Sequence, residues 1–245
     1  MRYYILASGS KGNSTLIQSG STNVLIDCGT TKKYLSETLS TIGFSIEDID
    51  ALVVTHSHKD HISQLKLFKD IPTYSTFETN HQIQNIISAY ESFRVNDLTF
   101  YPIALSHDSE DTLGFIIFDG YEKLVYVADT GYIRDQDLLH LVDANYIILE
   151  SNYDEALLMR SSRPYMTKQR IMSDRGHLSN HQCGQILQQI ITKNTTEIVL
   201  AHMSQEANND EVALATVKSY LEALDYEGTI TCSQQFKVVM GGQHD

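Results

Sequence analysis

The chain has no long hydrophobic run and few cysteines. No uninterrupted apolar stretch in its 245 residues approaches the ~20 residues that a membrane-spanning helix needs. The apolar part of the N-terminal segment is too short for a secretory signal peptide. The three cysteines (Cys28, Cys183 and Cys232) are an odd number without metal-type spacing, which favours reduced, buried thiols over disulfides. These scarcities predict a cytoplasmic protein with no membrane partner.

Positive charge is also scarce. The chain has 18 basic against 31 acidic residues, a formal net charge of −13, which argues against binding nucleic acid over its whole surface. Residues 160–175 are the exception, because this stretch contains five basic residues and only one acidic residue, Asp174. The five are Arg160, Arg163, Lys168, Arg170 and Arg175. This stretch is either an ordinary solvated helix face or a binding surface for a polyanion, with Tyr165 as a ring on which a base can stack.

Metal-binding side chains gather directly after one apolar run. Residues 51–55 are short, apolar and rich in β-branched side chains, which is typical of a buried strand. The segment His56-Ser57-His58-Lys59-Asp60-His61 follows at its carboxyl end, where α/β sheets usually build their sites. Four residues of ligand type within six exceed what one tetrahedral ion takes from so tight a turn. We therefore expect two adjacent metal ions here rather than a solvated loop.

Three further residues of ligand type follow later apolar runs. His107 comes after the run at 98–105, Asp129 after the run at 124–128, and His202 after the run at 197–201. A turn signal at residues 119–120 predicts a hairpin whose second strand leads to Asp129. The pattern places one candidate ligand at each strand end.

Alternation of short strands with helical segments predicts an α/β fold in a single domain over residues 1–245. The predicted strands are 3–7, 15–18, 24–27, 51–55, 72–75, 98–105, 115–118, 124–128, 146–149, 197–201, 229–231 and 236–240. Helical spacing predicts helices at 32–42, 65–68, 79–90, 182–191 and 210–224. No internal repeat, low-complexity tract or linker divides the chain.

The motif His56-x-His58-x-Asp60-His61, followed by the lone His, the Asp and the final His in that order, resembles the signature of the metallo-β-lactamase-fold hydrolases. A Ser-Gly-Ser-x-Gly-Asn turn at residues 8–13 resembles the YycJ/WalJ-like subgroup, which is related to the tRNase Z-type phosphodiesterases. This resemblance implies a four-layer αββα sandwich with mixed sheets.

The resemblance also implies how seven residues share two divalent ions. One ion would be bound by His56, His58 and His107, the other by Asp60, His61 and His202, and Asp129 would bridge the two. Zinc fits this set of nitrogen and oxygen ligands, and manganese or iron also fits. A water between the ions would lose its proton near neutral pH and attack as hydroxide, and Asp60 would hold it and accept its proton.

Two more residues resemble a catalytic pair of tRNase Z-type nucleases. Glu150 follows the apolar run at 146–149, and His177 lies in an Arg-Gly-His-Leu-Ser segment where Leu178 interrupts the Gly-His-Ser run of that group. The resemblance implies that the pair donates a proton to the departing oxygen. From the residues alone, Glu150 could equally be a solvated strand end, and His177 part of a helix cap.

These observations predict a dinuclear-metal phosphodiesterase that cleaves nucleic acid, similar to a 5′-3′ exonuclease, with the basic residues of 160–175 binding the substrate. DNA and RNA both stay open as substrates, and so does the oligomeric state. Two alternatives use the same fold: a hydrolase of small thioesters, lactones or lactams, and a non-catalytic regulatory protein. The complete set of ligands argues against the second alternative.

Overall fold

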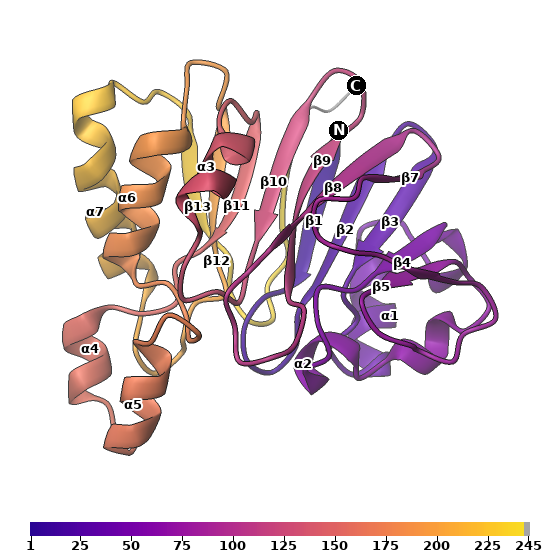
Figure 1. The fold of residues 1–245 in the computed structure, drawn as a ribbon, viewed down its shortest axis with the longest axis horizontal. Coiled ribbons are helices and arrows are strands. Elements are labelled where there is room, and N and C mark those ends of the chain that lie inside the picture. The colour runs from indigo at the N-terminus through magenta and orange to yellow at the C-terminus, as the bar shows by residue number, and fades with distance from the viewer. Residues whose placement is uncertain (243–245) are drawn as a thin grey trace.

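Two seven-stranded sheets pack face to face in the computed structural model, which describes residues 1–242 (Figure 1). The first sheet has the order β14 (Val239–Gly242), β1 (Arg2–Ala7), β2 (Ser14–Ser19), β3 (Thr22–Ile26), β4 (Ala51–Val53), β5 (Thr73–Ser75) and β6 (Gln84–Ile86). The second has the order β13 (Thr229–Cys232), β12 (Glu197–Ala201), β11 (Tyr146–Glu150), β10 (Lys123–Val127), β9 (Leu113–Phe118), β8 (Leu98–Ala104) and β7 (Phe93–Val95). Both sheets mix parallel and antiparallel pairs.

Helices cover the outer face of each sheet, as Figure 1 shows. The helix α1 (Lys32–Thr41) packs Leu35 and Leu39 against the first sheet. The second sheet is covered by α3 (Asp135–Leu141), α6 (Asn180–Ile190) and α7 (Asp210–Leu221). The predicted α/β fold with four αββα layers is confirmed.

The alternation of side chains along the strands explains the layers. In β1, Tyr3 and Ile5 enter the core between the sheets, whereas Tyr4 and Leu6 enter the core beneath α1. Successive residues of a strand point to opposite faces, so a strand buried on both faces is apolar throughout. Strands of both sheets contribute to the central core. The assignment of one domain to residues 1–245 stays a prediction that this shared core supports.

The carboxyl ends of the central strands meet at one edge of the sandwich. Strands β10, β11 and β12 run parallel and in register, with Val127 beside Leu149 and Leu149 beside Leu200. Three short helices lie at this edge, at the bottom of Figure 1. They are α2 (Lys59–Ile62), α4 (Glu155–Arg160) and α5 (Tyr165–Ile171). Among residues 1–242, no helix has both the length and the apolar character to cross a membrane.

One predicted helix is wrong. Residues 79–90 show apolar side chains at helical spacing, but they contain the edge strand β6 paired in parallel with β5. Of the four apolar residues in that pattern, only Ile87 is buried, while Ile83, Ile86 and Tyr90 are exposed. Pairing with the sheet edge outweighs the helical periodicity because no layer exists for that apolar face to cover.

Candidate metal centre

The seven predicted ligands lie together at the edge where the strands end. Groups with ligand atoms within 4.8 Å of one another are His56 with His58 and His107, Asp60 with His61 and His202, and His56 with His61 and Asp129. His56 follows β4, His107 follows β8, Asp129 follows β10 and His202 follows β12. The first two groups are the two sets that the family resemblance implies.

The backbone turns sharply where several of these strands end. Asp27, Asp129 and His202 have φ angles of 60°, 57° and 52°, in the left-handed region that residues other than glycine rarely adopt. Strain of this kind concentrates at functional sites, where the surrounding structure holds it in place. Each turn directs a polar side chain into the space beyond the sheet edge.

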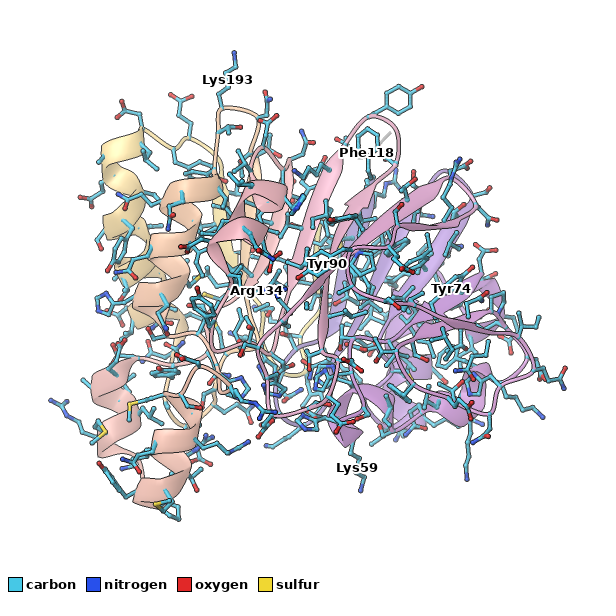
Figure 2. The ribbon with its side chains drawn as sticks, viewed as in Figure 1. Lys59, Tyr74, Tyr90, Phe118, Arg134 and Lys193 are labelled. Carbon is cyan, nitrogen blue, oxygen red and sulfur yellow. The ribbon has the colours of Figure 1, made fainter. Side chains whose placement is uncertain are left out.

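Neighbouring backbone holds the loop at 56–61 in place. The amide of Asn13 donates to the carbonyl of Asp60 at 2.8 Å, and the amide of Cys28 donates to that of His61 at 2.7 Å. A β-carbon on Gly29 would lie 1.5 Å from the Asp60 carbonyl oxygen, so only glycine fits there. Figure 2 shows Lys59, a residue of this loop without a ligand role, pointing away from the molecule into solvent.

Carboxylates support the imidazoles of one group. His61 Nδ1 lies 2.7 Å from Asp27 Oδ2, and His202 Nδ1 lies 2.8 Å from Glu150 Oε1. Both carboxylates are fully buried. A carboxylate accepts from Nδ1–H and leaves the Nε2 lone pair for a metal ion, which is the usual support for a metal-bound histidine. We call Asp60, His61 and His202 the acid-backed group.

Neutral groups support the imidazoles of the other set. His107 Nδ1 lies 3.1 Å from the Gly176 carbonyl oxygen, and His56 Nδ1 lies 3.0 Å from the Thr55 hydroxyl. His58 is more open, with a side chain 39% exposed. We call His56, His58 and His107 the neutral-backed group.

Three buried polar atoms in the cluster have no hydrogen-bond partner among residues 1–242. They are His56 Nε2, His202 Nε2 and Asp129 Oδ2. Leaving such atoms unsatisfied costs about 1–3 kcal/mol each, so they usually indicate an ion or water. One atom comes from each ligand group and one from the proposed bridge. The residues present therefore fit two divalent cations.

The two groups differ in their affinity for protons. Burial and the neighbouring His61 lower the pKa of His56 to about 2, and burial also lowers the pKa of His107. Burial opposes protonation of His202 as well, but Asp129 and Glu150 outweigh it and raise the pKa of His202 to about 9. In the same way Asp27 and Asp129 raise the pKa of His61. The neighbouring carboxylates therefore favour the protonated forms of His61 and His202, whereas burial favours the neutral forms of His56 and His107.

Glu150 and His177 meet beside the ligands. His177 Nδ1 lies 2.8 Å from Glu150 Oε1, and the His177 ring lies between the rings of His107 and His202, at centroid distances of 5.3 and 5.2 Å. Glu150 is fully buried rather than a solvated strand end. The cap of α6 is Ser179, whose side chain accepts from the Gln182 amide, so His177 has no capping role. The pair could also hold an ion together with Asp129 and His202.

The basic stretch at 160–175 spans α4 and α5. Arg163 Nε pairs with Glu206 Oε2 at 3.0 Å, and Arg175 Nε donates to the His107 carbonyl oxygen at 3.1 Å. Arg170 pairs with Asp108. Within the described residues, Arg160 has no ion pair and is exposed, and so is the ring of Tyr165.

The prediction that Lys168 binds the substrate is wrong. Its side chain is buried, and its Nζ donates to the carbonyl oxygens of Met159 and Ser161 at 2.7 and 2.8 Å. These two bonds close the turn between α4 and α5. Lys168 therefore stabilises the helical pair and presents no charge to a substrate.

Two supporting residues of the site were not assigned a role from the sequence. Asp27 orients His61 and also accepts from the Thr55 amide and hydroxyl, both at 2.9 Å. Asn13 Nδ2 lies 2.9 Å from His61 Nε2. Asn13 ends the turn at residues 8–13 that carries the subgroup resemblance, and Asp27 is the last residue of a predicted strand, but neither signal indicates which histidine the side chain contacts. The cysteines are free thiols, with Cys28 and Cys183 buried as predicted and Cys232 half-buried.

Known proteins resemble this chain over most of its length. The family model that describes the beta-lactamase superfamily domain matches residues 22–203. Exodeoxyribonuclease YycJ of Bacillus anthracis is 30% identical over 236 residues, which cover 91% of this chain and 89% of that protein. Two solved structures share the fold, with TM-scores of 0.75 and 0.66. They are the metallo-beta-lactamase fold protein YhfI from Bacillus subtilis (18% identity, 98% of this chain and 99% of that one) and the short form of human tRNase Z (16% identity, 98% of both chains).

Proposed function

Because the chain belongs to the beta-lactamase superfamily, we propose that it is a dinuclear-metal phosphodiesterase that cleaves nucleic acid in the manner of an exonuclease. The observation that carries this proposal is the Glu150–His177 pair, 2.8 Å apart and in contact with the ligand cluster. A hydrolase of lactams or thioesters needs the metal ligands but has no evident use for His177 as a proton donor beside them. The name of the Bacillus anthracis relative, an exodeoxyribonuclease, supports the same reading.

We assign the two ions to the residues that can hold them. The neutral-backed group would hold one divalent cation and the acid-backed group the other, with Asp129 between them and zinc as the proposed metal. Such a pair of cations supplies a nucleophile at neutral pH and neutralises charge on the reacting phosphate. Asp60, with a side chain 29% exposed, is placed to accept a proton from the attacking water.

His177 is assigned the role of proton donor. Glu150 accepts from Nδ1–H and fixes the orientation of the ring, so Nε2 is the nitrogen that can face the substrate. Glu150 is itself held by the Thr130 amide at 2.8 Å, which keeps the pair rigid. A positioned general acid protonates the oxygen that departs from phosphorus, so that an alkoxide need not leave unprotonated.

Substrate would approach over α4 and α5. Arg160, Arg163, Arg170 and Arg175 are the arginines at this edge, on a protein that is acidic elsewhere, and the exposed ring of Tyr165 lies among them. Arg160 offers the charge that is free of an internal partner. Phosphate oxygens bind arginine well because the guanidinium presents paired donors.

An assay of the purified protein with added zinc or manganese tests the proposal. Labelled single- and double-stranded DNA and RNA should be shortened from an end, bis-p-nitrophenyl phosphate should be hydrolysed more slowly, and a chromogenic lactam should be left intact. The Asp60→Asn variant is the control for contaminating nucleases. Hydrolysis of the lactam with intact nucleic acid would replace this proposal with the small-molecule hydrolase, and no turnover of any substrate would favour a regulatory protein.

A further inference from the structure

Asp108, the residue after the ligand His107, has no role in the proposed mechanism, although its carboxylate lies beside two of the ligand histidines. Its Oδ1 lies 3.2 Å from His107 Nε2 and 3.6 Å from His58 Nε2, and its Oδ2 pairs with Arg170. The side chain is 30% exposed, at the outer edge of the neutral-backed group. These are all of its polar contacts with residues 1–242.

The contact with His107 requires a cation. The Gly176 carbonyl oxygen only accepts hydrogen bonds, so His107 Nδ1 carries the hydrogen and Nε2 is left with a lone pair. An acceptor nitrogen and a carboxylate oxygen 3.2 Å apart repel each other unless a positive charge lies between them. A proton on Nε2 or a metal ion shared with His56 and His58 would supply that charge, and only the metal ion also explains the position of Asp108 Oδ1 between two histidines.

The spacing is that of ligands around one ion. Donor atoms at ~2.0–2.1 Å from a tetrahedral zinc ion are about 3.3 Å apart. The two distances from Asp108 Oδ1, 3.2 and 3.6 Å, bracket this separation. The neutral-backed group also lacks any carboxylate of its own apart from the bridging Asp129, so one more oxygen adds the negative charge that a divalent cation needs.

We propose that Asp108 Oδ1 is an additional protein ligand of the cation held by His56, His58 and His107, beside the bridging Asp129, and that Arg170 is its positioning residue. Arg170 comes from α5 and holds Oδ2, which leaves Oδ1 directed at the histidines. This assignment rests on the proposed function only in requiring that the cluster binds metal. It also changes the role of Arg170, which becomes part of the metal site before it is part of the substrate surface.

Titration of the metal-free protein with zinc tests the assignment, with elemental analysis of the loaded protein as a second measurement. We compare wild type with Asp108→Asn, in which the amide oxygen still accepts hydrogen bonds but the charge is lost. One of the two ions should bind Asp108→Asn about 10- to 100-fold more weakly, a range that follows loss of even indirect support of a metal site. The other ion should bind as in wild type.

Glu110→Gln is the matched control, because Glu110 is an exposed acid on the same loop. It should bind both ions as wild type does. Arg170→Gln should weaken the same single ion as Asp108→Asn, and Arg170→Lys should restore part of the affinity. Two ions bound at wild-type affinity by Asp108→Asn would overturn the ligand assignment, and unchanged affinity in Arg170→Gln would overturn the positioning role. A wild-type protein that binds no metal would instead refute the proposed function.

Discussion

The two ligand groups of the cluster both contain buried histidines, but different chemical groups support these histidines. In the acid-backed group, buried carboxylates hold His61 and His202 and raise the pKa of each. In the neutral-backed group, a hydroxyl and a carbonyl hold His56 and His107, and burial lowers the pKa of each. A carboxylate makes an imidazole a stronger base, and therefore both a stronger metal ligand and a better proton acceptor.

This difference implies that protons compete with the ion at one group but not at the other. An ion that enters the acid-backed group competes with protons on His61 and His202, whereas an ion that enters the neutral-backed group finds His56 and His107 already neutral. The neutral-backed group has no carboxylates behind its histidines, so it needs negative charge from another residue to bind its ion as tightly. We propose that Asp108 supplies this charge. Four experiments, in order of decreasing expected effect, sharpen or break this comparison.

Removal of one histidine from each group should abolish hydrolysis in both cases but destabilise only one protein. His58→Ala and His61→Ala should each reduce cleavage of labelled DNA to background. In the metal-free state His61→Ala also removes the partner of the buried Asp27 carboxylate, which should cost about 3 kcal/mol, the low end for a broken buried ion pair, because Thr55 still donates to it. Urea denaturation measures this loss. Equal stability of the two metal-free variants would show that support by Asp27 is unimportant.

Replacement of His177 should affect catalysis without affecting either group. His177→Ala should slow cleavage of an alkyl phosphodiester by ~10²–10⁴-fold, the usual contribution of a general acid. Cleavage of a nitrophenyl ester should fall much less, since that leaving group needs no proton. Elemental analysis should still find two ions per chain. Loss of an ion would instead assign His177 to the metal-binding group with Asp129, Glu150 and His202.

Acid should weaken metal binding to one group before the other. The raised pKa of His202, about 9, means that this histidine carries a proton in the metal-free protein at pH 6–8 and must lose it when metal binds. Release of this one proton should make affinity at the acid-backed group rise about tenfold per pH unit up to about pH 9, and release of a second proton from His61, whose pKa is also raised, should make the rise steeper. The lowered pKa values in the neutral-backed group predict little change over the same range. Calorimetric titrations in buffers of different ionisation enthalpy count the released protons, and identical pH dependence of both ions would break the comparison.

Reversal of charge at Arg160 should have the smallest effect and leave both groups intact. Arg160→Glu should weaken binding of a long oligonucleotide a few-fold and reduce the salt dependence by about one phosphate contact. Hydrolysis of bis-p-nitrophenyl phosphate should stay at the wild-type rate. Arg170 is unsuitable for this test because its pair with Asp108 reaches the histidines. Unchanged oligonucleotide affinity in Arg160→Glu would place the substrate elsewhere.

The ligands were predictable from the sequence because the strands β4, β8, β10 and β12 end at or just before His56, His107, Asp129 and His202, and the carboxyl ends of these strands lie at one edge of the sandwich. His107, Asp129 and His202 could be selected on that basis without knowing the sheet order. The contacts of the supporting residues were not predictable, since the role of Asp27 comes from its distance to His61, which lies 34 positions further along the chain. Lys168 shows the opposite failure. Its charge suggested a substrate contact, but its ammonium group donates hydrogen bonds to the carbonyl oxygens of Met159 and Ser161 in the turn between α4 and α5.

The left-handed backbone at Asp27, Asp129 and His202 restricts how this site can change. Aspartate, asparagine and histidine tolerate that conformation better than other residues with a side chain, whereas bulky or β-branched residues avoid it. At these three positions asparagine, aspartate and histidine are therefore the side chains that fit best, and glycine would fit the backbone but offer no ligand. The path of the main chain thus favours oxygen and nitrogen donors over a thiolate at the bridge and at the final histidine.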